Sequence, residues 1–249
     1  MQVSLMITCL CDNFYPQVGE ATVRVLRRLG ATVVFVPDQV CCGQPAFNAG
    51  YHDAAREVAR TCLRAFQDAE YVVSPSGSCA EMIRGNYLRL FKGDKDEFSV
   101  VEELRDKTYE FSEFLVKVMK TETIDGSFPH KVAYHPSCHL TRFLNIKDEP
   151  LQLLQSIADL ELVDLPRAYD CCGFGGTFSV KMAEVSEALV TEKAENVHRS
   201  GANVLVGADM GCLMNIKGRL EKLGSTVQVM HIAQVIDEAQ KAVKKATLP

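Results

Sequence analysis

Short apolar runs alternate along this chain with longer segments whose apolar residues recur every three or four positions. In the first half, the runs at 3–9, 32–36 and 71–74 predict buried strands. The segments at 21–29 and 55–66 carry their apolar residues at helical spacing, so they predict amphipathic helices between those strands. Strands that alternate with helices indicate a parallel sheet, because each crossover helix returns the chain to the same edge.

The second half repeats this order. Apolar runs at 131–138, 160–163 and 203–206 predict strands. Asp148, with a proline two residues later, is typical of a helix start, and a longer helix is predicted from about residue 180 to 197. Each half therefore predicts the same series of strands and crossover helices.

The ends of the two halves also match. Residues 109–115 resemble residues 230–236, and the polar stretch at 92–97 lies in the connection between the halves. We therefore expect two repeats, at 1–125 and 126–249. The predicted fold class is α/β, with two internally duplicated halves, each a small parallel sheet with crossover helices.

The cysteines follow the same duplication. In each half a lone cysteine precedes a Cys-Cys-Gly turn, by 31 residues in the first half and 32 in the second, and a last cysteine follows. Each lies just after a predicted strand, so these cysteine-bearing loops are expected at the C-terminal ends of the strands, where loops gather. The two quartets are Cys9, Cys41, Cys42 and Cys79, and Cys138, Cys171, Cys172 and Cys212.

Composition narrows the classes of function. Apolar residues make up 47% of the 249, the net charge is -5, and basic residues form no cluster, so a nucleic-acid partner has no support. The N-terminus does not resemble a signal peptide, and the apolar runs are far shorter than the roughly 20 residues of a membrane helix. We expect a cytoplasmic protein without membrane insertion. Its thiols would stay reduced, which favours metal ligation over disulfides.

Four thiolates per half are the ligand set of one iron–sulfur cluster or one zinc ion. Neighbouring cysteines point their side chains apart, which suits two iron atoms of one cluster better than a single zinc ion. The glycine after each pair can adopt a positive φ and lets the backbone approach closely. We therefore predict that all eight quartet cysteines bind iron–sulfur clusters of the [4Fe–4S] type, one per half. Zinc in one half, and purely structural or redox thiols, remain as alternatives.

Other residues near the quartets have weaker signals. Cys62 lies on the apolar face of a predicted helix and is expected in the core. Cys11 has no cysteine counterpart in the second half, so a structural role is favoured. His135 and His139 flank Cys138, and each could be satisfied locally or donate a hydrogen bond toward cluster sulfur.

The motifs around these cysteines are similar to those of the cysteine-rich domain family that carries Cys-Cys-Gly repeats. That family includes the B subunit of heterodisulfide reductase and the iron–sulfur subunit of glycolate oxidase. The strongest resemblance is to the lactate utilisation A proteins of bacteria, over essentially the whole chain. The motifs are Cys-Cys-Gly-Gln-Pro-Ala at 41–46, Val-Ser-Pro-Ser-Gly-Ser-Cys at 73–79, Ser-Cys-His at 137–139, Cys-Cys-Gly-Phe-Gly-Gly-Thr-Phe-Ser-Val-Lys-Met at 171–182, and Gly-Cys-Leu-Met-Asn at 211–215.

The chain departs from this family pattern at one position of each repeat. In the heterodisulfide reductase form each repeat ends in Cys-x-x-Cys, which gives five cysteines per site. Here the first cysteine of that pair is replaced by Ser76 and by Asp209. Four ligands fit an ordinary [4Fe–4S] cluster. The two substitutes are then oxygen ligands or, as we favour, ordinary loop residues.

The resemblance implies an oxidoreductase subunit that carries electrons during oxidation of L-lactate to pyruvate. It implies partners, namely other subunits of a lactate-oxidising complex, including a second iron–sulfur protein. No nicotinamide or flavin fingerprint is visible, so the chain is not expected to be catalytically complete alone, and no catalytic residue is assigned. The alternatives are a thiol–disulfide oxidoreductase subunit like heterodisulfide reductase and a zinc-stabilised scaffold. For docking, an apolar rim is expected beside the cysteines, with these candidates: Phe47, Phe174, Phe178, Met210 and Met214.

Overall fold

The chain folds into two four-stranded sheets, one from each half, in which every strand pair is parallel. The computed structural model describes residues 1–246 and, in the last helix, side chains up to residue 241. The strand orders, β2-β1-β3-β4 and β6-β5-β7-β8, are the same, so the predicted fold class and duplication are confirmed. The strands are β1 (Gln2–Leu5), β2 (Thr32–Phe35), β3 (Tyr71–Ser74), β4 (Thr108–Glu110), β5 (Lys131–His135), β6 (Glu161–Val163), β7 (Val204–Gly207) and β8 (Gln228–His231).

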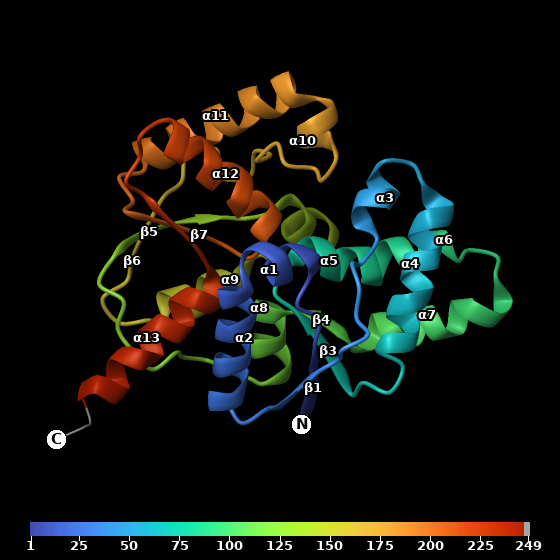
Figure 1. Cartoon of the computed structure of the whole chain (residues 1–249). Helices are drawn as coiled ribbons and strands as arrows, with labels where there is room; N and C mark the ends of the chain where they lie inside the picture. The colour runs from blue at the N-terminus through green and yellow to red at the C-terminus, as the bar shows by residue number, and fades with distance from the viewer. Residues whose placement is uncertain (247–249) are drawn as a thin grey trace.

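Helices of very different length connect the strands and cover the sheets (Figure 1). Those of the first half are α1 (Cys9–Phe14), α2 (Pro16–Arg28), α3 (Gln44–Asn48), α4 (His52–Ala65), α5 (Gly77–Glu81), α6 (Tyr87–Leu90), α7 (Lys95–Lys107) and α8 (Phe111–Glu113). Those of the second half are α9 (Asp148–Gln155), α10 (Phe178–Lys181), α11 (Ala183–Arg199), α12 (Met210–Lys222) and α13 (Ile232–Ala246). Single π-helical turns lie at Met82–Asn86, Phe114–Val118 and His139–Phe143.

Local sequence signals explain where the crossover helices begin and end. Helix α2 begins with Pro16, whose fixed φ and missing N–H suit the first helical position. It ends before Gly30, which has a φ of +92°, a conformation that glycine adopts without a steric penalty. Its buried face includes Ala21, Val25 and Leu26, as the apolar spacing predicted.

Two segments differ from the expected elements. The helix predicted from residue 180 to 197 is broken at Met182, whose φ of −123° and ψ of +51° separate α10 from α11. Helix α7 was not predicted within the connection between the halves, because it begins inside the polar stretch at 92–97 and only Val101 and Leu104 of the helix are buried. Its N-cap, Asp94, accepts hydrogen bonds from the backbone N–H groups of Asp96 and Glu97.

The two halves share one of the apolar cores. The largest cluster of buried side chains combines Val25 and Val73 of the first half with Val132, Val206 and Ile236 of the second. Helix α2 packs beside α13, as Figure 1 shows at the lower left. None of the helices in residues 1–246 has both the length and the apolar character that a membrane crossing requires. The division into 1–125 and 126–249 stays a prediction.

A buried charge cluster joins α2 to α13. Asp237 is only 2% exposed in its side chain and pairs with Arg28 Nη1 at 2.7 Å and Arg24 Nη2 at 2.9 Å. Lys241 Nζ lies 2.7 Å from the same carboxylate. These partners hold the pKa of Asp237 below its usual value, although burial alone would raise it. The first and last long helices are thereby held together.

Candidate metal centre

All eight quartet cysteines lie at the C-terminal ends of strands, as predicted. Cys9 and Cys138 follow β1 and β5, at the start of α1 and just before the π-helical turn at His139–Phe143. The pairs Cys41-Cys42 and Cys171-Cys172 follow β2 and β6. The last cysteine of each quartet lies in the first turn of a helix, Cys79 in α5 and Cys212 in α12. The parallel topology thus gathers residues that are far apart in sequence.

Within the first quartet the sulfur atoms touch one another. Cys9 Sγ lies 3.6 Å from Cys41 Sγ, and Cys42 Sγ lies 3.3 Å from Cys79 Sγ. These are non-bonded contacts, well beyond the roughly 2.05 Å of a disulfide, and all ten cysteines are free thiols. In the second quartet Cys172 Sγ and Cys212 Sγ lie within 4.8 Å of each other, and Cys138 and Cys171 line the same cavity as they do. The structure therefore brings the predicted residues together as two groups of four.

The two quartets also have the same arrangement of exposed and buried sulfur. In each half the second cysteine of the pair and the last cysteine are buried, whereas the lone cysteine and the first of the pair lie nearer the surface. Cys171 is the one exposed member. Each site therefore has an inner and an outer pair of sulfur donors.

The glycine of each Cys-Cys-Gly turn is required by its backbone conformation and by its neighbours. Gly43 and Gly173 have φ values of +86° and +80°. The backbone N–H of each donates to the sulfur two residues earlier, at 3.5 Å to Cys41 and 3.3 Å to Cys171. A Cβ on Gly173 would lie 2.7 Å from the carbonyl oxygen of Ser186. The positive φ expected for this glycine is therefore present, and the turn also packs closely against a helix, whereas its approach to a cluster stays a prediction.

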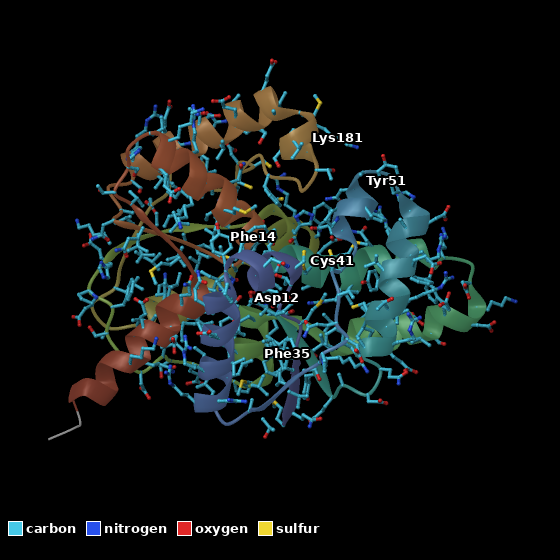
Figure 2. All side chains as sticks on the ribbon, viewed as in Figure 1. Asp12, Phe14, Phe35, Cys41, Tyr51 and Lys181 are labelled. Atoms are coloured by element: carbon cyan, nitrogen blue, oxygen red, sulfur yellow. The ribbon has the colours of Figure 1, made fainter. Side chains whose placement is uncertain are left out.

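Both quartets line one cavity of about 150 Å³. Loops of the first half and of the second half form its walls, together with His139, Phe174 and Met210. Near its outer loops, Lys181 of α10 places its ammonium 5.6 Å from the centre of the Tyr51 ring, just before α4. Figure 2 labels these two side chains on facing parts of the halves, with Cys41 below them in this view. The quartets therefore face a common space rather than two separate surfaces.

Ser76 and Asp209 cap the helices that carry the last cysteines. Ser76 Oγ accepts the N–H of Cys79, and Asp209 Oδ1 accepts the N–H of Gly211. Asp209 also reaches the other half, where its Oδ2 accepts the N–H of Ser78 at 2.8 Å. Both side chains are thus occupied as N-caps, the arrangement that typically stabilises a helix start. This agrees with the interpretation of Ser76 and Asp209 as loop residues.

Mutual electrostatics limits how many of these thiols can ionise without a cation. Hydrogen bonds from Cys42 and Cys9 lower the pKa of Cys41, and hydrogen bonds from Cys138 and Cys172 lower that of Cys171. The hydrogen bond to Cys41 in turn raises the pKa of Cys9 well above its usual value, with burial adding to the shift. One thiolate per quartet is therefore stabilised by its neighbours' S–H groups. Ionisation of all four needs a bound metal.

The remaining predicted residues are buried thiols, cavity-lining apolar residues and two histidines. Cys11 and Cys62 are fully buried and pack in apolar clusters, as expected for structural thiols. Phe174 and Met210 line the cavity, although Met210 is only 6% exposed and also packs in the core. His139 Nδ1 lies 3.6 Å from Cys138 Sγ. His135 is 2% exposed, and neither of its ring nitrogens has a hydrogen-bond partner within the described part of the chain.

Several polar side chains that support the cysteine loops were not predicted. Tyr87 donates its hydroxyl hydrogen bond to the carbonyl oxygen of Cys42 at 2.9 Å, and Asn215 Nδ2 donates to that of Cys172 at 2.8 Å. Gln44 Nε2 donates to the carbonyl oxygen of Ser78 at 3.0 Å. Gln44 and Asn215 lie within the quoted family motifs, which was the available signal. Tyr87 lies outside these motifs, so no sequence signal indicates that it supports a cysteine loop; only its burial in the structure does.

Comparison with known proteins agrees with this duplicated cysteine arrangement. The family model described as the CCG cysteine-rich domain matches twice, at residues 3–84 and 132–217. Lactate utilization protein A of Geobacillus kaustophilus is 52% identical over 237 residues, covering 95% of this chain and 99% of that protein. Lactate utilization protein A 2 of Bacillus cereus is 47% identical over 236 residues, covering 95% and 98%.

One solved structure shares the overall fold. A hypothetical protein from Helicobacter pylori superimposes with a TM-score of 0.65 at 12% sequence identity. The match covers 96% of this chain, which spans about half (49%) of that longer chain. At this identity the likeness concerns the fold alone.

Proposed function

The chain belongs to the CCG cysteine-rich domain family, together with the lactate utilization A proteins, and from that membership we propose that it is an iron–sulfur electron-transfer subunit of lactate utilisation. In this proposal Cys9, Cys41, Cys42 and Cys79 hold one cluster and Cys138, Cys171, Cys172 and Cys212 hold another. A bound cluster would supply one-electron storage. The chain's own residues supply the sulfur donors, the caps and the buried surroundings.

The observation that carries the proposal is the pair of sulfur quartets that face one cavity. Each quartet offers four converging thiols, two of them buried. The cavity between the quartets has a volume of about 150 Å³, which leaves space beside the thiols for a bound group. Two redox centres that line one cavity, each with its own ligands, are suited to passing electrons from one to the other. We favour the [4Fe–4S] type because Ser76 and Asp209 are engaged as caps and leave four sulfur ligands per site.

The proposed reaction needs partners. Oxidation of L-lactate to pyruvate releases two electrons and two protons, and a partner subunit would remove them from the substrate. This chain would then relay the electrons, with a second iron–sulfur protein in the same complex. Exposed apolar side chains beside the cysteine loops support a docking role: Val180 is 80% exposed, Met182 51% and Val185 46%.

Reconstitution tests this function. The anaerobically purified chain, alone and with candidate lactate-oxidising partners, would be assayed for lactate-dependent dye reduction. We expect activity only in the reconstituted mixture, and its loss with a Cys42→Ala variant that still binds its partners. An exposed control, His198→Gln, should keep the activity. Turnover by the chain alone, without added subunit or cofactor, would refute the relay.

A specific observation favours a zinc-stabilised scaffold as a second candidate. The two sulfur pairs of the first quartet have S···S distances of 3.6 and 3.3 Å. Sulfur ligands in a tetrahedron around one zinc ion lie about 3.8 Å apart, given Zn–S bonds of about 2.3 Å, so the observed spacing is close to that of a zinc site. Iron, zinc and acid-labile sulfide analysis of anaerobic protein separates the two candidates. The cluster proposal requires iron with sulfide and visible absorption. The scaffold requires stoichiometric zinc and a colourless protein.

The shared cavity also favours a thiol–disulfide oxidoreductase, because a disulfide held there would meet both quartets. Reduction of a disulfide consumes two electrons and two protons and yields two thiols. The isolated, reduced chain would be mixed with small disulfides and its reoxidation followed. Rapid reoxidation of the reduced chain by a disulfide, with no reduction of the oxidised chain by lactate and the lactate-oxidising partners, would favour this candidate over the relay.

A further inference from the structure

The inner surroundings of the two quartets differ at two buried positions. In the second half these are His135, at the end of β5, and Lys193, in the middle of α11. Met6 is the counterpart of His135, because each stands three residues before the lone cysteine of its quartet. Met6 is fully buried and cannot donate a hydrogen bond to sulfur. The duplication is therefore broken at a position that contacts the site.

The counterpart of Lys193 follows from the contacts of the two turn glycines. Gly43 faces the carbonyl oxygen of Ala55 in α4, and Gly173 faces that of Ser186 in α11. When the two helices are matched at these contacts, Lys193 coincides with Cys62. Cys62 is fully buried in an apolar cluster. The second half therefore has a cationic side chain where the first has a neutral thiol.

His135 is aimed at the inner sulfur pair of the second quartet. One of its ring nitrogens and the sulfur atoms of Cys172 and Cys212 all lie within 4.8 Å of one another. A neutral imidazole has one N–H, and leaving it unpaired in the interior costs free energy. Neither nitrogen has a partner among residues 1–241. The sulfur of an occupied second site would supply the acceptor that the ring lacks.

Lys193 is buried beside the loop that leads into the second cysteine pair. Its side chain is 1% exposed, and its Nζ donates to the carbonyl oxygens of Arg167 at 2.8 Å and Ala168 at 2.9 Å. Attraction to Asp170 and then to the thiols of Cys172 and Cys212 opposes the lowering of its pKa by burial. Lys193 and Cys171 line the same small pocket, and a buried cationic group there favours extra negative charge on the site.

Two carboxylates would oppose this effect. Asp170, the residue before Cys171, pairs with Arg167 Nε at 2.5 Å, which offsets its charge. The other is Asp209. Its carboxylate accepts hydrogen bonds from Gly211, Ser78 and Ser76, which spread its charge. Ser78 is next to Cys79 of the first quartet, so the carboxylate lies between the halves and acts on both sites. It therefore does not cancel the difference that His135 and Lys193 create.

We propose that the second quartet holds the cluster with the higher reduction potential, because His135 donates an N–H hydrogen bond to sulfur of that site and Lys193 stabilises its reduced form. Hydrogen bonds to cluster sulfur and nearby positive charge both favour reduction. Electrons then enter at the first quartet and leave from the second, one at a time. This inference rests on the proposed function, since it requires a cluster in each half.

The test is a redox titration of the full chain, followed by electron paramagnetic resonance. A variant with Cys171→Ala and Cys172→Ala assigns the signal that remains to the first site. We expect two separate midpoint potentials, with the second site more positive. His135→Met, which installs the residue of the first half, should shift the second-site potential negative and leave the first unchanged. Met6→His should shift only the first-site potential, in the positive direction.

Further variants separate an electronic role from a structural one. His135→Gln keeps an N–H donor and should retain more of the second-site potential than His135→Met does. Lys193→Met should shift the second-site potential in the negative direction. Lys193→Arg keeps the positive charge and should retain the wild-type potential. Exposed His198→Met is the matched control and should change neither potential. A second-site potential that stays constant in folded, iron-loaded His135→Met and Lys193→Met proteins would overturn the inference.

The failure of this inference is distinguishable from failure of the proposed function. Two clusters with equal potentials, or a more positive first site, would refute the direction of electron flow and leave the iron–sulfur function standing. Protein that carries zinc and no iron would refute both.

Discussion

Ser76 Oγ donates a hydrogen bond of 3.2 Å to Asp209 Oδ2, which joins the same position of the two repeats across the boundary between the halves. Each residue also caps the helix that carries the last cysteine of its own quartet. The backbone N–H of Gly77 donates to the carbonyl oxygen of Ala208 beside them, at 3.2 Å. The two candidate sites are therefore supported by one shared set of hydrogen bonds.

Asp209→Ala should weaken both sites at once. The change leaves the N–H groups of Gly211 and Ser78 without this acceptor, so we expect the free energy of unfolding to fall by about 1–3 kcal/mol. Iron content of both halves should also fall. Urea unfolding and iron analysis measure the two effects. Asp94→Ala, which removes the N-cap of α7 alone, should cost some stability and no iron; equal iron loss in both variants would contradict the prediction.

Cys171→Ala with Cys172→Ala should remove about half of the iron and leave the first quartet loaded. The reason is that each half has its own four sulfur atoms in contact. Iron analysis and visible absorption of the anaerobic variant measure the outcome. Cys62→Ala, which removes a buried thiol outside both quartets, is the control and should retain all the iron. If the double variant folded but lost all iron, the quartets would share one site.

Gly173→Ala should lower stability and second-site iron content by more than the cost of placing alanine at a positive φ. The new Cβ would lie 2.7 Å from the carbonyl oxygen of Ser186, so the Cys-Cys-Gly turn or α11 must move. Gly201 has a similar φ of +69° with open space around it, so Gly201→Ala should cost only about 1–2 kcal/mol. Thermal unfolding and second-site iron content would be measured. Equal effects of the two substitutions would show that the close approach is unimportant.

Metal removal should lower the melting temperature substantially. In the metal-free chain the sulfur atoms lie in contact and the neighbours raise the pKa of Cys9 and Cys138. A bound metal displaces the thiol protons and ties the four sulfur atoms of a quartet together, and the binding free energy then adds to folding stability. Calorimetry of loaded and chelator-treated protein under anaerobic conditions tests this. Identical melting temperatures, with metal loss verified, would rule it out.

Glu110→Gln should reduce the loss of stability at alkaline pH. Burial raises the pKa of Glu110 to about 8, although the hydroxyl and N–H of Ser112 and the N–H of Glu113 lower it. A raised carboxyl pKa means that the folded protein keeps its proton while the unfolded chain loses it above about pH 4.5. Stability from this group is therefore complete below pH 4.5 and is lost as pH rises toward 8.

The expected loss from Glu110 is on the order of 3 kcal/mol between pH 5 and 8. It is measured as the difference between urea unfolding of wild-type and Glu110→Gln protein at each pH, so that other groups cancel. Glu113→Gln is a nearby comparison, because Glu113 pairs with Arg84 at 2.6 Å. A constant difference between wild type and Glu110→Gln across this range would contradict the assigned pKa.

Much of the fold was predictable because its signals are local. The run at 71–74 became β3 with the expected bounds, and the segment at 21–29 lies largely in helix α2, as its apolar spacing predicted. Local signals did not predict two features, the break between α10 and α11 and the presence of helix α7. The break at Met182 lies in a segment whose apolar spacing continues across it, and helix α7 has too few buried residues to stand out.

The amino-acid sequence by itself determined the duplication, the parallel α/β topology and the grouping of cysteines at the strand ends. All three follow from periodicity and spacing along the chain, taken within each half and compared between the two halves. Only the tertiary structure decided that both quartets face one cavity, that Ser76 meets Asp209, and that His135 and Lys193 are buried beside one quartet alone. Ser76 and Asp209 are 133 residues apart in the chain. Such contacts depend on how the two halves pack and which atoms are removed from water, and no local pattern encodes either.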